Sequence, residues 1–210
     1  MANHTAVQDM LIEANGLRFT VDTAGPAEGP AVLLLHGFPQ TRHTWRAELT
    51  ALAAAGYRAC APDQRGYSAG ARPDGIDNYR VELLVADALL VDNAGALRRA
   101  MARNAVPETD IDAYLDTLSD REALDAAVNW YRAMGQSSIQ SSDTPAITVP
   151  TMFVWGNEDV TVGRMAAENT ADYVTGPYRF AEIPGVNHFV TDEAPGAFTE
   201  LLLDHLAEHG

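Results

Sequence analysis

The stretch that decides the fold is Ala31-Val32-Leu33-Leu34-Leu35-His36-Gly37-Phe38-Pro39. The unbroken apolar run of residues 31–35 is typical of a strand that is buried on both faces, as in a parallel sheet. The turn that follows contains a glycine, which lets backbone N–H groups point toward a developing negative charge. Because ligands of open α/β sheets bind beyond the carboxyl ends of the strands, residues 36–39 form a candidate oxyanion-binding turn.

Strand and helix patterns alternate around this stretch. Residues 12–21 predict a hairpin about the Asn15-Gly16 turn, and residues 57–61 predict a second buried strand. A helix is expected over residues 44–55, with Gly56 as its end. Further elements are predicted toward the C-terminus: strands at 151–155 and 178–183, and helices near 164–173 and at 195–209. This alternation favours an α/β fold with a mostly parallel sheet and flanking helices.

The middle of the chain has a different pattern. Residues 92–140 carry helical periodicity and no strand signal, which predicts a helical insertion. We therefore expect residues 1–91 and 145–210 to form an α/β core and residues 92–144 to form a helical cap remnant.

Composition excludes several classes of function. The 210-residue chain has a formal net charge of −15, which disfavours nucleic acid as a partner. All its Lys+Arg residues are arginines, so Schiff-base lysine chemistry and a lysine phosphate loop are excluded. Cys60, the single cysteine, supports no internal disulfide or cysteine zinc site, and we predict no metal or cofactor. No membrane segment or secretory signal is visible, so the cytoplasm is the expected compartment.

Two polar residues follow the late predicted strands. Asp159 comes shortly after the strand at 151–155, and His188 follows the strand at 178–183. A carboxylate in the first loop is well placed to orient a histidine in the second, and such a histidine is a candidate general base. Alone, each is more often an ordinary polar loop residue. The pair, with the acid before the histidine after consecutive strands, is a more specific indication of a general base and its orienting acid.

The motifs together resemble the α/β-hydrolase superfamily, and within it the epoxide hydrolase branch. The resemblance covers residues 11–209 and rests on five motifs in family order: His36-Gly-Phe-Pro-Gln40, Asp63-Gln-Arg-Gly-Tyr-Ser68, Asn129-Trp-Tyr-Arg132, Asp159 and His188. It implies an α/β-hydrolase-like fold with a helical cap and hydrolysis of neutral, mainly apolar small molecules.

The resemblance also implies roles for individual residues. Phe38 would contribute a backbone N–H to the oxyanion hole, while His36, Gly37 and Pro39 shape its turn. Asp159 would be the acid that orients the base, and His188 would activate water. Tyr131 matches a cap tyrosine that protonates the opening epoxide; without the resemblance, it reads as a packing residue of a helix face.

The nucleophile of the family is missing from the expected place. A strand–nucleophile–helix turn belongs before the cap, but only residues 88–91 lie between the helix near Asn78 and the cap pattern. The family fills this place with two βα units, at about 30 residues each. The chain is thus predicted to be a shortened α/β-hydrolase fold that lacks central strands. Gly66-Tyr67-Ser68-Ala69-Gly70 matches a serine nucleophile motif, but no strand leads into it and no helix follows it.

Three hypotheses follow. The chain is an epoxide-hydrolase-like enzyme with a His188–Asp159 base, a serine esterase that uses Ser68, or a catalytically inactive hydrolase-fold binding protein. Loss of central strands would leave apolar strand edges that favour association into a homo-oligomer, unless the strands at 31–35 and 151–155 pair with each other.

Overall fold

The computed structural model describes residues 5–14, 17–74, 101–102, 105–118, 121–134 and 146–209, with no side-chain description at 121 and 130–134. The chain forms two compact units. The first comprises Met1–Arg103 and Pro107–Ser137, and the second comprises Asn104–Val106 and Ser138–Gly210. Most of the predicted helical insertion therefore belongs to the first compact unit. Its assignment as a cap stays a prediction.

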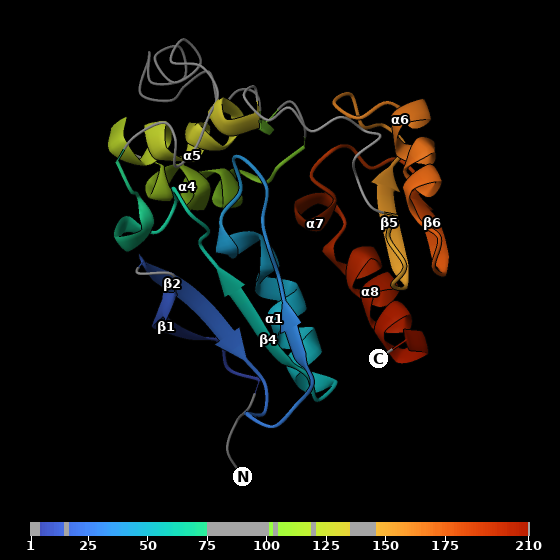
Figure 1. Cartoon of the computed structure of the whole chain (residues 1–210), viewed down its shortest axis with the longest axis horizontal. Coiled ribbons are helices and arrows are strands. Elements are labelled where there is room, and N and C mark those ends of the chain that lie inside the picture. Colours follow the sequence, from blue (N-terminus) through green and yellow to red (C-terminus); the bar gives the residue numbers. More distant parts are fainter. Residues whose placement is uncertain are drawn as a thin grey trace. The chain divides into compact units, whose positions relative to one another are not determined.

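The first unit contains a four-stranded sheet in the order β1-β2-β4-β3 (Figure 1). Its strands are β1 (Gln8–Ala14), β2 (Leu17–Ala24), β3 (Ala31–Leu33) and β4 (Arg58–Pro62). The predicted hairpin is confirmed, because β1 and β2 are antiparallel and Ala14 pairs with Leu17. β4 is antiparallel to β2 and parallel to β3, so the sheet is mixed.

Strand β3 differs from the expectation of a strand buried on both faces. It ends at Leu33, and the side chains alternate: Leu33 is 64% exposed, Leu34 is 6% exposed and Leu35 is 53% exposed. Among the described residues β3 pairs only with β4, and only the face that carries Leu34 is covered. The apolar run alone could not reveal that Leu33 and Leu35 remain exposed.

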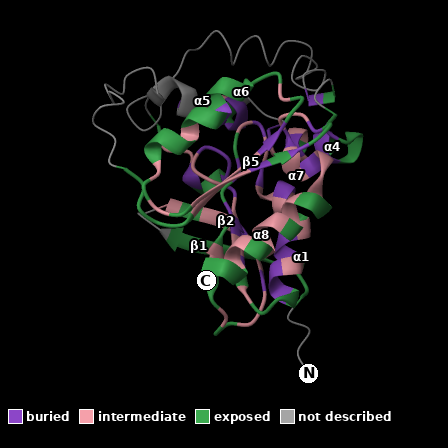
Figure 2. Cartoon of the chain, turned by 90° about the vertical axis from the view of Figure 1, so that its right-hand side faces the viewer, coloured by how far each residue is buried: buried purple, intermediate pink, exposed green. Residues whose placement is uncertain are grey.

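Helices cover the sheet of the first unit. The 3-10 helix η1 (Arg42–Trp45) leads into α1 (Arg46–Ala54), which packs against β2 and β4. Leu49 and Leu52 of α1 are buried, and Gly56 follows the helix at φ +90°, as its predicted end requires. Figure 2 shows buried parts of α1 in purple. After β4 comes the short 3-10 helix η2 (Ala69–Ala71), followed later by α4 (Glu108–Thr117) and α5 (Arg121–Met134).

The second unit contains two parallel strands, β5 (Thr151–Gly156) and β6 (Tyr178–Ile183), paired from Thr151↔Tyr178 to Gly156↔Ile183. They are joined through α6 (Arg164–Glu168) and the 3-10 helix η5 (Asn169–Tyr173). The helices α7 (Val190–Glu193) and α8 (Pro195–His209) follow, and α8 has the predicted bounds. Among the described strands β5 pairs only with β6, so no pairing between β5 and β3 is present there.

Candidate active site

The predicted oxyanion turn lies in the first unit, directly after β3. The His36 side chain is buried, its Nδ1–H donates to the carbonyl of Gly37 (3.0 Å), and its Nε2 accepts from the backbone N–H of Gln64 (3.2 Å). Burial lowers the pKa of His36 and outweighs the opposing effects of Gly37 and Asp63. His36 is therefore a neutral residue with both ring nitrogens occupied, suited to shaping the turn. The Phe38–Pro39 peptide bond in this turn is cis.

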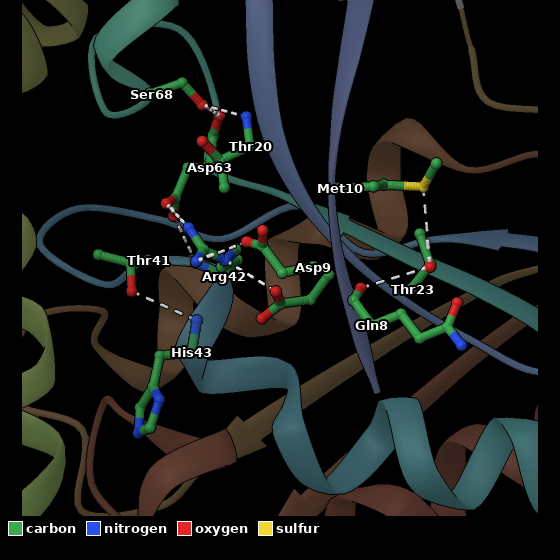
Figure 3. Close-up of polar contacts among 11 residues, drawn as sticks. Gln8, Asp9, Met10, Thr20, Thr23, Thr41, Arg42, His43, Asp63 and Ser68 are labelled. Carbon is green, nitrogen blue, oxygen red and sulfur yellow. Dashed lines mark hydrogen bonds and ion pairs between the residues drawn. The ribbon is translucent and has the colours of Figure 1, made fainter. Parts of the chain in front are cut away.

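An ion-pair network fastens the segment that follows the turn (Figure 3). The backbone N–H of Arg42 donates to Asp63 Oδ1 (2.9 Å), and its guanidinium pairs with the other oxygen of Asp63. The same guanidinium contacts Asp22 Oδ1 (2.9 Å) and Asp9 Oδ2 (3.3 Å). Burial raises the pKa of Asp22, although Arg42 opposes the shift. Arg42 thus ties η1 to the loop after β4 and to the hairpin.

The side chain of Ser68, in the first unit, is hydrogen-bonded to main-chain groups. It is 2% exposed, its hydroxyl donates to the carbonyl of Asp63 (2.6 Å), and its Oγ accepts from the backbone N–H of Thr20 (3.0 Å) (Figure 3). Ser68 precedes the three-residue η2 rather than a full helix. This geometry lacks the strand-to-helix turn that exposes a serine nucleophile.

The second unit brings the predicted acid and base together. Asp159 follows β5, His188 follows β6, and Nδ1 of His188 lies 2.9 Å from Oδ2 of Asp159. The Asp159 side chain is 5% exposed and that of His188 is 33% exposed. Because an ionised carboxylate only accepts hydrogen bonds, Nδ1 carries the proton and Nε2 is the basic nitrogen of the neutral ring. No hydrogen bond from the described residues occupies Nε2 of His188.

The carboxylate of Asp159 is held by its own loop as well. Its Oδ1 accepts from the backbone N–H groups of Thr161 (2.7 Å) and Val162 (2.9 Å). Burial raises the pKa of Asp159, but the hydrogen bonds from His188, Val162 and Thr161 outweigh it, so the pKa lies below its ordinary value. Asp159 is therefore ionised at neutral pH and can orient the imidazole.

The two loops are joined by contacts that the sequence did not single out. The backbone N–H of Glu158 donates to the carbonyl of Val186 (2.9 Å), and the Asn157 side chain accepts from the N–H of Gly185 (2.8 Å). Asn187 accepts from the N–H of His188 (2.8 Å). An asparagine beside a loop histidine or aspartate is only a weak sequence indication of such contacts, because asparagine is common in all turns.

The remaining predicted site features are not tested by the described residues. Tyr131 lies in α5, and its side chain falls outside the description, as do residues 88–91, where the nucleophile turn is expected to be missing. His36, Gly37, Phe38 and Pro39 belong to the first unit, whereas Asp159 and His188 belong to the second.

The part of the chain that the structure describes contains no group of three or more His, Cys, Asp or Glu side chains arranged to hold a metal ion. None of its helices is both long and apolar enough to cross a membrane.

Comparisons with known proteins agree with the fold. Residues 30–125 match the family described as alpha/beta hydrolase fold. The crystal structure of epoxide hydrolase A from Mycobacterium thermoresistibile is similar with a TM-score of 0.77 at 20% identity, over 96% of this chain and 98% of that one. That likeness shows the fold.

Curated proteins similar to this chain include epoxide hydrolases. Epoxide hydrolase A of Mycobacterium tuberculosis is 25% identical over 314 residues, which span 96% of this chain and 98% of the relative. Because this chain has only 210 residues, more than a hundred residues of that relative have no counterpart here. An epoxide hydrolase of Caballeronia sordidicola is 49% identical over 73 residues, or 35% of this chain and 22% of the relative. The chain therefore has an α/β-hydrolase fold, and it is similar to epoxide hydrolases while having fewer residues than the Mycobacterium tuberculosis relative.

Proposed function

We propose that the chain hydrolyses neutral, mainly apolar epoxides, with His188 as the general base and Asp159 as the residue that orients it. The observation that carries this proposal is the 2.9 Å hydrogen bond from His188 Nδ1 to Asp159, which leaves Nε2 as the basic nitrogen. The names of the curated relatives support an epoxide as the substrate class.

The proposed step is the direct addition of water. Nε2 of His188 removes a proton from water while the water oxygen bonds to an epoxide carbon, and the ring C–O bond breaks. The resulting alkoxide takes up a proton from a donor group, and the proton held by His188 then returns to that donor through solvent, so water and epoxide give a vicinal diol. Asp159 stays ionised and stabilises the imidazolium that forms.

Two further roles rest on the match to motifs of the family. By its match to a cap tyrosine of the family, Tyr131 is the proton donor to the alkoxide, which is a strong base and a poor leaving group without a proton. The backbone N–H of Phe38, in the turn shaped by His36, Gly37 and Pro39, is proposed to stabilise negative charge on oxygen.

No alkyl-enzyme ester is part of this proposal, because the sequence contains no identifiable carboxylate nucleophile on a strand-to-helix turn. A single turnover with excess protein in H₂¹⁸O distinguishes the two routes. Direct attack of water places ¹⁸O in the first diol formed. An ester route places an enzyme oxygen there, and a first diol without ¹⁸O would overturn the direct step.

The general base is tested with a chromogenic aryl epoxide. We expect His188→Ala and Asp159→Asn to lower the rate of diol formation by about 10²–10⁴-fold, as in other enzymes that lose a base or its orienting acid. His209→Gln, at the end of α8, is the matched control and is expected to leave the rate unchanged. Equal rates for the wild type and His188→Ala would remove the hypothesis.

A second candidate is a catalytically inactive hydrolase-fold protein that binds small apolar molecules. It is favoured by the hundred or more residues of the Mycobacterium tuberculosis relative that have no counterpart here. Its signature is saturable binding of the aryl epoxide, measured by calorimetry, together with no diol after prolonged incubation. Diol formation that depends on His188 excludes it.

A further inference from the structure

Asn187 contacts both loops that carry the candidate base and its acid. Its side-chain Oδ1 accepts from the backbone N–H of His188 (2.8 Å) and, over a longer distance, from the backbone N–H of Val160 (3.4 Å). Val160 is the residue directly after Asp159. A single amide oxygen thus connects the main chain beside the imidazole with the main chain beside the carboxylate.

The main chain of Asn187 is fixed as well. Its backbone N–H donates to Oε1 of Glu193 (2.5 Å), which lies in α7. The residue is therefore held by a helix while its side chain holds the loops. Asn187 is half-buried, so these hydrogen bonds face only partial competition from water.

In the His188–Asp159 pair, Nδ1 of the imidazole is hydrogen-bonded to Oδ2 of the carboxylate. Asp159 uses Oδ1 for Thr161 and Val162, which leaves Oδ2 for the imidazole. Among the described residues, the side chain of His188 has a hydrogen bond only with Asp159, and it makes an edge contact with the ring of Phe189 (5.3 Å between centroids). The direction of its ring therefore depends strongly on where its backbone is held.

We propose that Asn187 is a positioning residue that keeps the imidazole of His188 in hydrogen-bond register with Asp159 and thereby fixes the proton on Nδ1. It acts through the backbone of His188 and Val160 and does not touch the substrate. The importance of this register for turnover rests on the proposed function, but the register itself can be measured without turnover.

The tautomer of His188 is the direct readout. Which nitrogen carries the proton is set by the hydrogen bond that the ring makes, and ¹⁵N NMR of histidine-labelled protein distinguishes the two neutral forms. The His188 signals are assigned by their loss in His188→Gln. We expect the wild type to hold the Nδ1–H form and Asn187→Ala to move toward a mixture of both forms.

Two further variants make the test specific. Asn157→Ala also removes an asparagine side chain from this pair of loops. Asn157, however, bonds to Gly185 and Glu182, whereas Asn187 bonds to the backbone of His188 and Val160. It is expected to keep the Nδ1–H form. Asn187→Asp retains an accepting oxygen at the same position, so it is also expected to keep that form.

The outcomes separate this inference from the proposed function. An unchanged tautomer in Asn187→Ala, an equal change in Asn157→Ala, or loss of the Nδ1–H form in Asn187→Asp would each overturn it, whether or not the protein turns over. Where epoxide hydrolysis is measurable, we expect Asn187→Ala to lower kcat about tenfold with little change in KM, because the defect is in the geometry of the base. A fall in substrate affinity with unchanged kcat would contradict it.

Discussion

The backbone of Gly156 lies against the carbonyl group of Val186, at the point where β5 meets the loop that carries His188. A Cβ atom built on Gly156 would lie 2.3 Å from the carbonyl oxygen of Val186 and 2.5 Å from that of Asn187. Real Cβ atoms essentially never approach other atoms closer than 3.0 Å. Glycine at this position is what allows the loops of Asp159 and His188 to lie together.

We predict that Gly156→Ala lowers the free energy of unfolding by about 3 kcal/mol, because rigid backbone groups must move to admit the methyl group. Urea denaturation at neutral pH measures the change. Gly163→Ala is the matched control: nothing lies within 4 Å of its added Cβ, and its φ is −68°. Its effect is expected to stay below about 1 kcal/mol. Similar losses for both variants would show that the close approach is not what makes Gly156 necessary.

The lowered pKa of Asp159 predicts that the second unit loses stability at acidic pH. The pKa of this carboxyl is lower in the folded chain than its ordinary value of 3.8. Its stabilising contribution is therefore complete above the unfolded pKa and is lost as the pH falls through the folded pKa. We expect the stability difference between the wild type and Asp159→Asn to be constant above about pH 5 and to shrink below pH 4.

Carbon-13 NMR of the carboxyl groups tests the cause of this shift. In His188→Ala the carboxylate loses a hydrogen-bond donor, so the pKa of Asp159 is expected to rise toward its ordinary value. In the control His209→Gln it should not change. An unaltered pKa of Asp159 in His188→Ala would mean that the backbone N–H groups of Thr161 and Val162 alone hold it down.

Removal of the charge on Asp63 is predicted to destabilise the first unit. The side chain of Asp63 is 4% exposed and that of Arg42 is 27% exposed, so Asp63→Asn leaves a partly buried guanidinium without its main counter-ion. We expect a loss of about 2 kcal/mol, below the range for fully buried pairs because Arg42 retains some contact with water and with Asp22. Thermal unfolding followed by circular dichroism measures it.

Glu168→Gln provides the comparison. Its partner Arg164 is 51% exposed and Glu168 itself is 54% exposed, and water screens such pairs strongly. We expect Glu168→Gln to have the same melting temperature as the wild type. A loss for Asp63→Asn as small as that of Glu168→Gln would contradict an anchoring role for the network around Arg42.

Much of the fold could be predicted from local patterns. The Asn15-Gly16 turn and the alternation around it indicated the β1–β2 pair, and the spacing of Leu49 and Leu52 indicated α1. Strand β6 and helix α8 have the predicted bounds, because apolar periodicity there coincides with clear proline and glycine boundaries.

Properties that depend on neighbours could not be predicted in this way. The exposure of Leu33 and Leu35 depends on what covers β3, which its own residues do not encode. The approach of Gly156 to Val186 and the bridging role of Asn187 are contacts between segments about 30 residues apart, and no periodicity marks them. The order of Asp159 and His188 was informative because each follows a strand of the same parallel pair.

The environment of Ser68 leads to a final prediction about the esterase hypothesis. A serine nucleophile needs an accessible Oγ and a base to accept its proton. Ser68 is 2% exposed, and its hydroxyl hydrogen is directed at the carbonyl of Asp63. We expect no covalent labelling of Ser68 by a fluorophosphonate probe in the folded protein, as read by peptide mass spectrometry.

The same geometry predicts a structural effect of Ser68→Ala. The N–H of Thr20 and the carbonyl of Asp63 would each lose a partner, so the free energy of unfolding should fall by about 1–3 kcal/mol. Thr50→Ala removes a hydroxyl from the exposed side of α1 and is expected to leave stability nearly unchanged, because alanine favours the helix. Labelling of Ser68 together with wild-type stability of Ser68→Ala would reverse the assignment, since a hydroxyl that is dispensable for folding yet reactive is free to act as a nucleophile.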